Sequence, residues 1–215
     1  IQITGIAKGS GMIAPDMATM LRFIFSDANI PSNILQTLLS RNVQNTFNAI
    51  TVDSDASTSD TVLLFATGAA KSIAPTSADD PVLKDFELAL QSVMLNLAKQ
   101  IVCDGEGAQK LIQVNVTGAT SKKSARKIGL AIANSPLVKT AIAGGDANWG
   151  RVVMAVGKSG EKANPNKISV CFGKTIIAEK GAVVEGYDEA PVTEHLQGRV
   201  TVSYTHLTLP TMAIV

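Results

Sequence analysis

The sequence predicts an α/β fold of the α+β kind, and three observations support this prediction. Short apolar runs with strand-like alternation lie between segments whose apolar residues recur at helical spacing. Hydrophobic residues make up 46% of the 215 residues and charged residues only 17%, a composition that can bury a core. Because aromatic residues amount to only 4%, that core must rest on aliphatic side chains.

The first seventy residues alternate between predicted strands and a predicted helix. Residues 19–26 form a strand whose two faces are both apolar, so we expect both faces to be covered. A helix follows Pro31, with apolar residues at helical spacing. We expect a short strand over 49–53 and, after a polar loop, a buried strand over 61–68.

A long amphipathic helix follows the surface connection at 71–81. Asp79 and Asp80 precede Pro81, which is a strong signal for a helix start. The apolar residues that define its buried face are Leu83, Phe86, Leu90, Val93, Met94, Leu97 and Ile101. The glycines of "CDGEGA" end the helix, and "KLIQVNVTGA" (110–119) alternates as a strand.

The chain from about Ser121 onward predicts a second α+β unit. It contains a helix over 124–133, a short apolar segment over 137–143, a helix over 152–156, and strands in "KISVCFG" and "TIIAEKGAVV". The polar loop "GGDANWGR" lies between the apolar segment and the second of these helices. We interpret its Asp146 and Arg151 as residues that fix a structural corner.

Composition and residue counts argue against several classes of function. The net charge is +1 without a basic run, which argues against binding nucleic acid or an anionic membrane by bulk charge. Cys103 and Cys171 form no disulfide framework; we interpret them as buried small hydrophobic residues of an intracellular protein. The spacing of Asp53, Asp55 and Asp60 does not fit a calcium loop, so we interpret them as loop and turn formers and expect no metal site.

The stretch "AKGSGMIAPDMATML" (7–21) carries the candidate chemistry. It places Lys8 in a glycine-broken loop, and Ala18 and Thr19 where the loop becomes a strand. A threonine hydroxyl needs a base, and the α-amine of Thr19, with a pKa of about 7.7–8.0, could serve if the Ala18–Thr19 bond were cleaved. From the residues alone, Lys8 could equally be a solvated lysine and Thr19 an ordinary strand residue.

This stretch resembles the self-cleavage segment of the ornithine acetyltransferases, the glutamate N-acetyltransferases of arginine biosynthesis. The resemblance extends from residue 1 to about residue 200. Its other motifs are "NAITVDSDASTSDTVLL" (48–64), "CDGEGAQKLIQVNVTGA" (103–119), "SKKSARKIGLAIANSPLVKTAIAGGDANWGRVVMAVGKSG" (121–160) and "ISVCFG" (168–173). It implies a layered αββα-type sandwich of the N-terminal-nucleophile-like kind, with a smaller C-terminal α+β unit.

The resemblance also implies an activity and its residues. Thr19 attacks the Ala18 carbonyl, which splits a precursor into α and β chains. Thr19 then carries an acetyl group from N-acetylornithine to glutamate by a ping-pong mechanism. Lys8 and Glu106 correspond to substrate contacts, Lys8 suiting the α-carboxylate and Glu106 the ornithine ammonium. No cofactor is implied, although acetyl-coenzyme A is a substrate of bifunctional members.

The same resemblance implies an organisation and a location. We expect an α2β2 heterotetramer in the cytoplasm, or in the mitochondrial matrix if the source is a fungus. Residues 1–18 would end the α chain, 19–120 would form the catalytic part of the β chain, 121–201 a C-terminal unit, and 202–215 a non-native tail.

Two departures from the family pattern suggest a fragment. The Thr-Gly pair of the oxyanion hole and the C-terminal asparagine and threonine of the substrate site find no counterpart in the chain. Two alternatives remain: an amidohydrolase or aminopeptidase with the same fold and nucleophile, and an uncleaved, inactive fragment.

Overall fold

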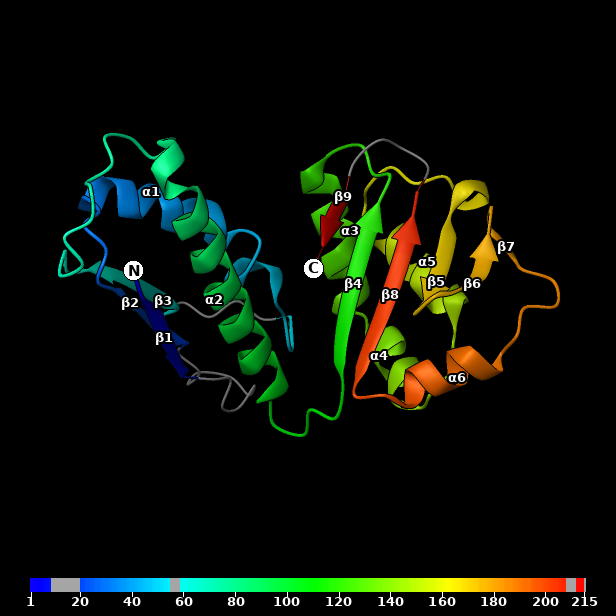
Figure 1. The fold of residues 1–215 in the computed structure, drawn as a ribbon. Coiled ribbons are helices and arrows are strands. Elements are labelled where there is room, and N and C mark those ends of the chain that lie inside the picture. The colour runs from blue at the N-terminus through cyan, green and yellow to red at the C-terminus, as the bar shows by residue number, and fades with distance from the viewer. Residues whose placement is uncertain (9–19, 55–58, 208–211, 215) are drawn as a thin grey trace. The chain divides into compact units, whose positions relative to one another are not determined.

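The structure, a computed structural model, describes residues 1–8, 20–54, 59–207 and 212–214. The chain divides into two compact units, Ile1–Ala108 and Gln109–Val215 (Figure 1). Each unit combines helices with its own sheet and its own hydrophobic core, which confirms the predicted α+β fold. Within the described residues, no helix is both long and apolar enough to cross a bilayer.

The first unit is built on a three-stranded sheet in the order β1–β2–β3. β1 (Ile3–Lys8) pairs antiparallel with β2 (Leu21–Ser26), and β2 pairs parallel with β3 (Thr61–Ala66). A parallel pair requires a crossover connection, which here contains α1 (Ser32–Val43) and the 3₁₀ turn η1 (Phe47–Ala49).

Helix α2 (Lys84–Cys103) lies along β1 and covers one face of this sheet (Figure 1). The short turn η2 (Pro81–Leu83) precedes it, and Asp80 caps that turn by accepting a hydrogen bond from the Val82 N–H at 3.1 Å. The predicted helix start is therefore confirmed, and so is the predicted buried face except for Val93, which is only partly buried. The most deeply buried apolar side chains of this unit are Ile24, Ala28, Leu38, Leu90, Met94, Ala98 and Ile101.

The opposite face of the sheet is apolar and exposed. We call it the open sheet face; it consists of Ile6, Phe23, Phe25, Leu63 and Phe65, which alternate with the core-facing residues. Ile6 is 64% exposed, Phe25 and Phe65 are each 43% exposed, and Leu63 is 41% exposed. The rings of Phe25 and Phe65 stack with centroids 5.2 Å apart. The predictions that β2 is covered on both faces and that β3 is buried are therefore wrong within this chain.

Two further predictions for the first unit need correction. The strand expected over 49–53 does not form: Ala49 ends the turn η1, and residues 50–53 have irregular backbone with a bend. Lys8, expected in a loop, is the last residue of β1. The alternation in "ITGIAK" is interrupted by a glycine, which is why the sequence pattern gave no strand there.

The second unit has a six-stranded mixed sheet in the order β7–β6–β5–β8–β4–β9. β4 pairs parallel with β8 and antiparallel with β9, and β5 pairs antiparallel with both β8 and β6. The strands are β4 (Leu111–Thr117), β5 (Ser169–Phe172), β6 (Thr175–Glu179), β7 (Ala182–Val183), β8 (Val200–His206) and β9 (Met212–Ile214). The helices are α3 (Lys122–Ala133), α4 (Pro136–Ala143), α5 (Trp149–Lys158) and α6 (Ala190–Gln197), and the 3₁₀ turn η3 covers Pro165–Lys167.

Side-chain caps start three of these helices. The side chains of Ser121, Ser135 and Asn148 each accept a hydrogen bond from a backbone N–H in the first turn of α3, α4 and α5. The predicted strand region "TIIAEKGAVV" is a hairpin rather than one strand. Its two-residue turn uses Lys180 and Gly181, both at positive φ, as a tight hairpin turn requires.

Candidate functional site

The register of the first sheet brings three distant segments together at one edge. Leu21, the first residue of β2, pairs with Lys8 at the end of β1 and with Thr61 at the start of β3. The side chain of Lys8 is exposed and alternates with that of Ala7, so it lies on the same side as the open sheet face. Residues 9–19, which include the predicted cleavage site Ala18 and nucleophile Thr19, lie outside the described residues.

Met20, which directly follows Thr19 in the chain, is fixed through both of its backbone polar groups. Its N–H donates to Oδ1 of Asp60 at 3.1 Å, and its carbonyl oxygen accepts from the Thr61 N–H at 3.0 Å. Asp60, which the sequence suggested was a loop former, therefore bonds to a residue 40 positions away. The start of β3 therefore holds both backbone polar groups of Met20.

Arg22 is a buried cation two residues beyond Met20, and sequence reasoning missed it. Its side chain is only 3% exposed, and its guanidinium lies 4.3 Å from the centroid of the Phe47 ring. It donates to the Met20 sulfur at 2.8 Å, whereas its Nε has no hydrogen-bond partner. Burial lowers the pKa of the Arg22 guanidinium, and the Asp60 carboxylate opposes that shift. An arginine on the inward-facing side of an apolar strand was the signal available in the sequence.

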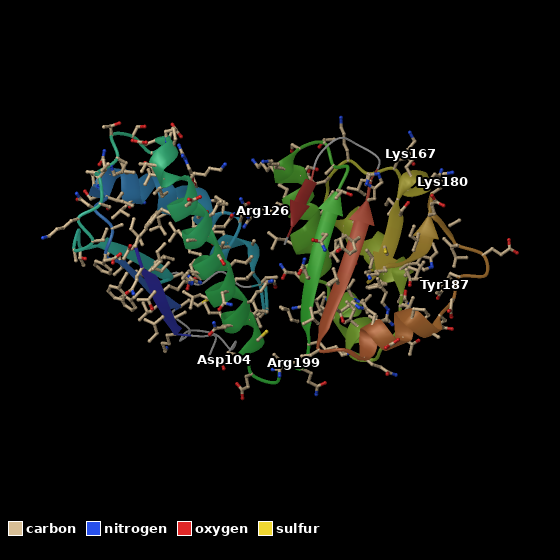
Figure 2. All side chains as sticks on the ribbon, viewed as in Figure 1. Asp104, Arg126, Lys167, Lys180, Tyr187 and Arg199 are labelled. Carbon is tan, nitrogen blue, oxygen red and sulfur yellow. The ribbon has the colours of Figure 1, made fainter. Side chains whose placement is uncertain are left out.

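Glu106 is displayed by a tight turn after α2. The Ala108 N–H donates to the Gly105 carbonyl at 2.9 Å, and Gly107 has φ +72°, a value at which glycine is favoured. The Glu106 side chain is exposed. Figure 2 labels Asp104 at the C-terminal end of α2, two residues before Glu106.

Lys8 and Glu106 come from neighbouring elements of the first unit. Figure 1 shows β1 and α2 side by side, ending toward the same end of that unit. The end of β1 thus provides an ammonium and the turn after α2 a carboxylate, both accessible to solvent. Groups of this kind can bind the carboxylate and the ammonium of an amino acid.

The loop "GGDANWGR" is a structural corner, as predicted. Nη1 of Arg151 donates to the Leu137 carbonyl at 2.8 Å and to Oγ1 of Thr140 at 3.1 Å, which ties α5 to α4. Asp146 accepts a hydrogen bond from the side chain of Asn148, the cap of α5. Cys171 and Cys103, expected to be buried, are both free and partly exposed. Among the described residues, no group of three or more His, Cys, Asp or Glu side chains could hold a metal ion.

Comparison with known proteins decides the family. The model of the ArgJ family matches residues 1–209. The chain belongs to the ArgJ family. This confirms the resemblance to the ornithine acetyltransferases found in the sequence.

ArgJ proteins of several bacteria are similar to the chain over most of its length. The arginine biosynthesis bifunctional protein ArgJ of Gluconobacter oxydans (strain 621H) is 59% identical over 199 residues, which are 93% of this chain and 47% of that protein. The protein of the same name from Nitrobacter winogradskyi is 60% identical over 200 residues, 92% of this chain and 48% of that protein. The chain therefore spans about half the length of the curated ArgJ proteins that it matches.

An ArgJ crystal structure has the same fold. The arginine biosynthesis bifunctional protein ArgJ of Bacillus halodurans matches with a TM-score of 0.86 and 38% sequence identity. The match covers 93% of this chain and 92% of the solved chain. The solved chain is therefore about as long as this one, and about half as long as the curated relatives.

Proposed function

We propose that the full-length protein that carries this chain is a self-processing acetyltransferase of arginine biosynthesis. It moves the acetyl group of N-acetylornithine to glutamate through an acetyl-Thr19 intermediate, after cleavage between Ala18 and Thr19. The observation that carries this proposal is the identity of 59–60% to proteins named arginine biosynthesis bifunctional protein ArgJ.

Cleavage is an acyl shift followed by hydrolysis. Oγ of Thr19 attacks the carbonyl carbon of Ala18, the amide C–N bond breaks, and an ester to Oγ forms while the proton passes to the nitrogen. Water then hydrolyses the ester, which leaves a carboxylate on Ala18 and both a free hydroxyl and a free α-amine on Thr19. The hydrogen bonds of the Met20 backbone to Asp60 and Thr61 support this step, since they hold the residue that directly follows Thr19 in the chain.

Acetyl transfer uses the two groups that cleavage leaves on Thr19. The α-amine accepts the proton of Oγ while Oγ attacks the acetyl carbonyl of N-acetylornithine, and ornithine leaves with that proton. The amine of glutamate then attacks the acetyl ester, which gives N-acetylglutamate and regenerates the hydroxyl. In this scheme Lys8 binds the substrate's α-carboxylate, and Glu106 pairs with the side-chain ammonium of ornithine.

Chain lengths among the relatives support processing into two chains. The solved ArgJ chain from Bacillus halodurans is about half as long as the curated ArgJ proteins, and this chain covers 92% of it. Two separate chains made from one precursor would account for that ratio.

The open sheet face supports a partner for the first unit. Ile6, Phe25, Leu63 and Phe65 are 41–64% exposed and adjoin one another in the sheet register. An apolar surface of this kind marks an interaction site in a folded protein. The partner we propose is the remainder of the α chain, to which strand β1 also belongs under the proposed cleavage, in an α2β2 heterotetramer.

The remaining assignments concern the acetyl donor and the location. The word "bifunctional" in the names of the relatives supports acetyl-coenzyme A as a second acetyl donor, used as a substrate rather than a resident cofactor. The bacterial sources of those relatives support a cytoplasmic rather than a mitochondrial location.

The proposal is tested with the full-length protein and its Thr19→Ala variant. We expect the wild-type protein to run as two chains, the C-terminal one starting at Thr19, and mass spectrometry after incubation with N-acetylornithine to find an acetyl group on that residue. Thr19→Ala should remain one uncleaved, inactive chain. Release of free acetate without transfer to glutamate would instead indicate an amidohydrolase, and a processed, active Thr19→Ala protein would overturn the nucleophile.

A further inference from the structure

The imidazole of His195 accepts a backbone hydrogen bond that the sheet of the second unit leaves open. Where β5 meets β8, the Gly173 N–H donates to the Val202 carbonyl at 2.8 Å. A regular antiparallel pair would add a second bond, from the Val202 N–H to the Gly173 carbonyl. However, β5 ends at Phe172, and the chain turns at Gly173 with φ +60°. The Val202 N–H instead donates to Nε2 of His195 at 2.9 Å.

The ring of His195 is packed closely against this turn. A Cβ built on Gly173 would lie 2.9 Å from Cγ and 3.0 Å from Nδ1 of the ring, so the absence of a side chain at Gly173 leaves room for the imidazole. His195 belongs to the last turn of α6, a helix that packs on both β8 and β5. Its side chain is only partly buried, so protons from the solvent can reach it. His195 therefore joins the end of α6 to the start of β8.

We propose that this contact is an acid-sensitive latch, which holds α6 to β8 while the imidazole of His195 is neutral and opens when the imidazole is protonated. A backbone N–H can only donate, so Nε2 is the acceptor and the proton of the neutral ring lies on Nδ1. The imidazolium carries a proton on both nitrogens and cannot accept the bond. Histidine is the side chain whose charge normally changes between about pH 5 and 8.

The sign of the pH dependence follows from the number of protons bound. The open form binds one proton more than the latched form, so the contact is present at neutral pH and weakens as the pH falls. Because His195 lies in the last turn of α6, the helix dipole favours a cation there, and the imidazolium is stabilised once it has left Val202. This inference does not depend on the proposed function.

In the part of the chain that the structure describes, no charged group near the latch forms an ion pair with the imidazole. The charged and titratable groups on the elements around it are Glu194 of α6, Arg199, Lys110, Lys174 beside Gly173, Cys171 of β5, and Tyr204 and His206 of β8. Nζ of Lys110 donates to the Leu196 carbonyl instead. Burial raises the pKa of the Cys171 thiol, which keeps this group neutral. The protonation of His195 itself therefore controls the latch.

The experiment measures hydrogen exchange at the Val202 amide of the full-length protein, at about pH 7.5 and about pH 5.5. Dividing the rate of an unstructured peptide at the same pH by the measured rate gives a protection factor. We expect the wild-type protection factor to fall about three- to tenfold at the lower pH, which is the size expected for the loss of one hydrogen bond. Nitrogen NMR of the ring at the higher pH should show the Nδ1–H tautomer.

Two variants assign the effect to one histidine. His195→Gln keeps an acceptor near the position of Nε2 but cannot titrate, so its protection factor should be the same at both pH values. His206→Gln is the matched control, because it removes the other histidine of the chain. Nδ1 of His206 lies 2.8 Å from the Thr117 hydroxyl, which can either donate or accept, so protonation does not break that contact. The control should keep the pH dependence of wild type.

Several results would overturn the latch. One is a wild-type protection factor at Val202 that is equal at both pH values. Another is a His195→Gln protein that retains the wild-type pH dependence, or a His206→Gln protein that loses it, since the titrating group would then lie elsewhere. If His195→Gln does not fold, the tautomer decides: an Nε2–H ring at His195 in the wild-type protein contradicts the proposed bond. None of these measurements uses acetyl transfer, so a failure of the proposed function leaves this test intact.

Discussion

Strand β8 carries three hydroxyl side chains on its buried face, and removing one should stabilise the protein. Thr201, Ser203 and Thr205 are at most 1% exposed, and the hydroxyl oxygen of each has no hydrogen-bond partner. In the sheet register they lie beside the inward-facing apolar residues Ile112, Val114 and Val116 of β4. A central strand thus presents hydroxyl groups to an apolar core.

The expected gain follows from the desolvation of one hydroxyl. A buried hydroxyl without a partner costs about 1–3 kcal/mol relative to water, and valine has nearly the same shape as threonine. Thr205→Val should therefore raise the free energy of unfolding of the second unit by about 1–2 kcal/mol. The gain in a Thr201→Val, Thr205→Val double variant should be close to the sum, with some coupling because both side chains lie on one strand.

Urea unfolding followed by the fluorescence of Trp149 measures this effect. Trp149 is the only tryptophan of the chain and packs against the core of the second unit, so its signal reports that unit. A gain of this size moves the urea midpoint upward by roughly 1 M. Thr117→Val is the matched control on the adjacent strand, because its hydroxyl lies 2.8 Å from Nδ1 of His206. Removing this hydroxyl loses a hydrogen bond, so the urea midpoint of the control should fall. A Thr205→Val midpoint that falls as in the control would refute the reasoning.

Two further predictions use the same urea assay. Gly181→Ala should destabilise the second unit by roughly 3 kcal/mol, because φ is +78° and the new Cβ would clash with the backbone carbonyl oxygen of Pro165. Gly186→Ala, with φ +69° and open space around it, should cost only about 1–2 kcal/mol. The hydrogen bond from Lys127 lowers the pKa of Glu161, so the stability from this pair is present above the unfolded-state pKa and is lost as pH falls through the folded-state pKa. The midpoint of Glu161→Gln should therefore fall less between about pH 5 and 3 than that of wild type, and an equal fall would contradict the role of this pair.

Helices were the most predictable part of the fold. In α2, the spacing of Phe86, Leu90, Met94 and Leu97 sets one apolar face over about three turns, and all four are buried. Local capping signals were equally reliable, since the effect of Asp80 before Pro81 depends on neighbouring residues alone. Periodicity and caps are properties of a short segment and can be read from it.

Strand environments were predicted less well, because they depend on what lies on each face. The apolar residues Phe25 and Phe65 suggested buried strands, yet both rings are 43% exposed on the open sheet face. The pattern of a strand shows which residues share a face of the sheet, but it does not show whether the same chain supplies a layer that covers that face. The strand of Lys8 was missed because Gly5 interrupts its pattern, although that glycine allows close approach of α2.

The site was only partly predictable for the same reason. Lys8 and Glu106 emerged from the family resemblance, whereas the contact of Asp60 with Met20 depends on a strand register between segments 40 residues apart. Arg22 was visible as an arginine in an apolar strand, but its stacking on Phe47 was not, because no pattern in the sequence indicated the turn η1 that contains Phe47.

Both sheets expose aromatic side chains, on the open sheet face of the first unit and on β8 of the second. Only the open sheet face has the pattern expected of a surface that another layer covers. On the open sheet face, Phe25 and Phe65 are exposed while the reverse side of β2 and β3 buries apolar residues, so a covering layer would complete a consistent sandwich. In β8, Tyr204 is 45% exposed while its neighbours Ser203 and Thr205 are buried without partners. A partner over Tyr204 would leave the cost of those hydroxyls unchanged, because they face the other side. The buried hydroxyls begin at Thr201, before the predicted tail, and the family model matches the whole of β8, so this pattern is a property of the strand itself. The non-native origin of residues 202–215 remains a prediction, and the family model matches the chain up to residue 209.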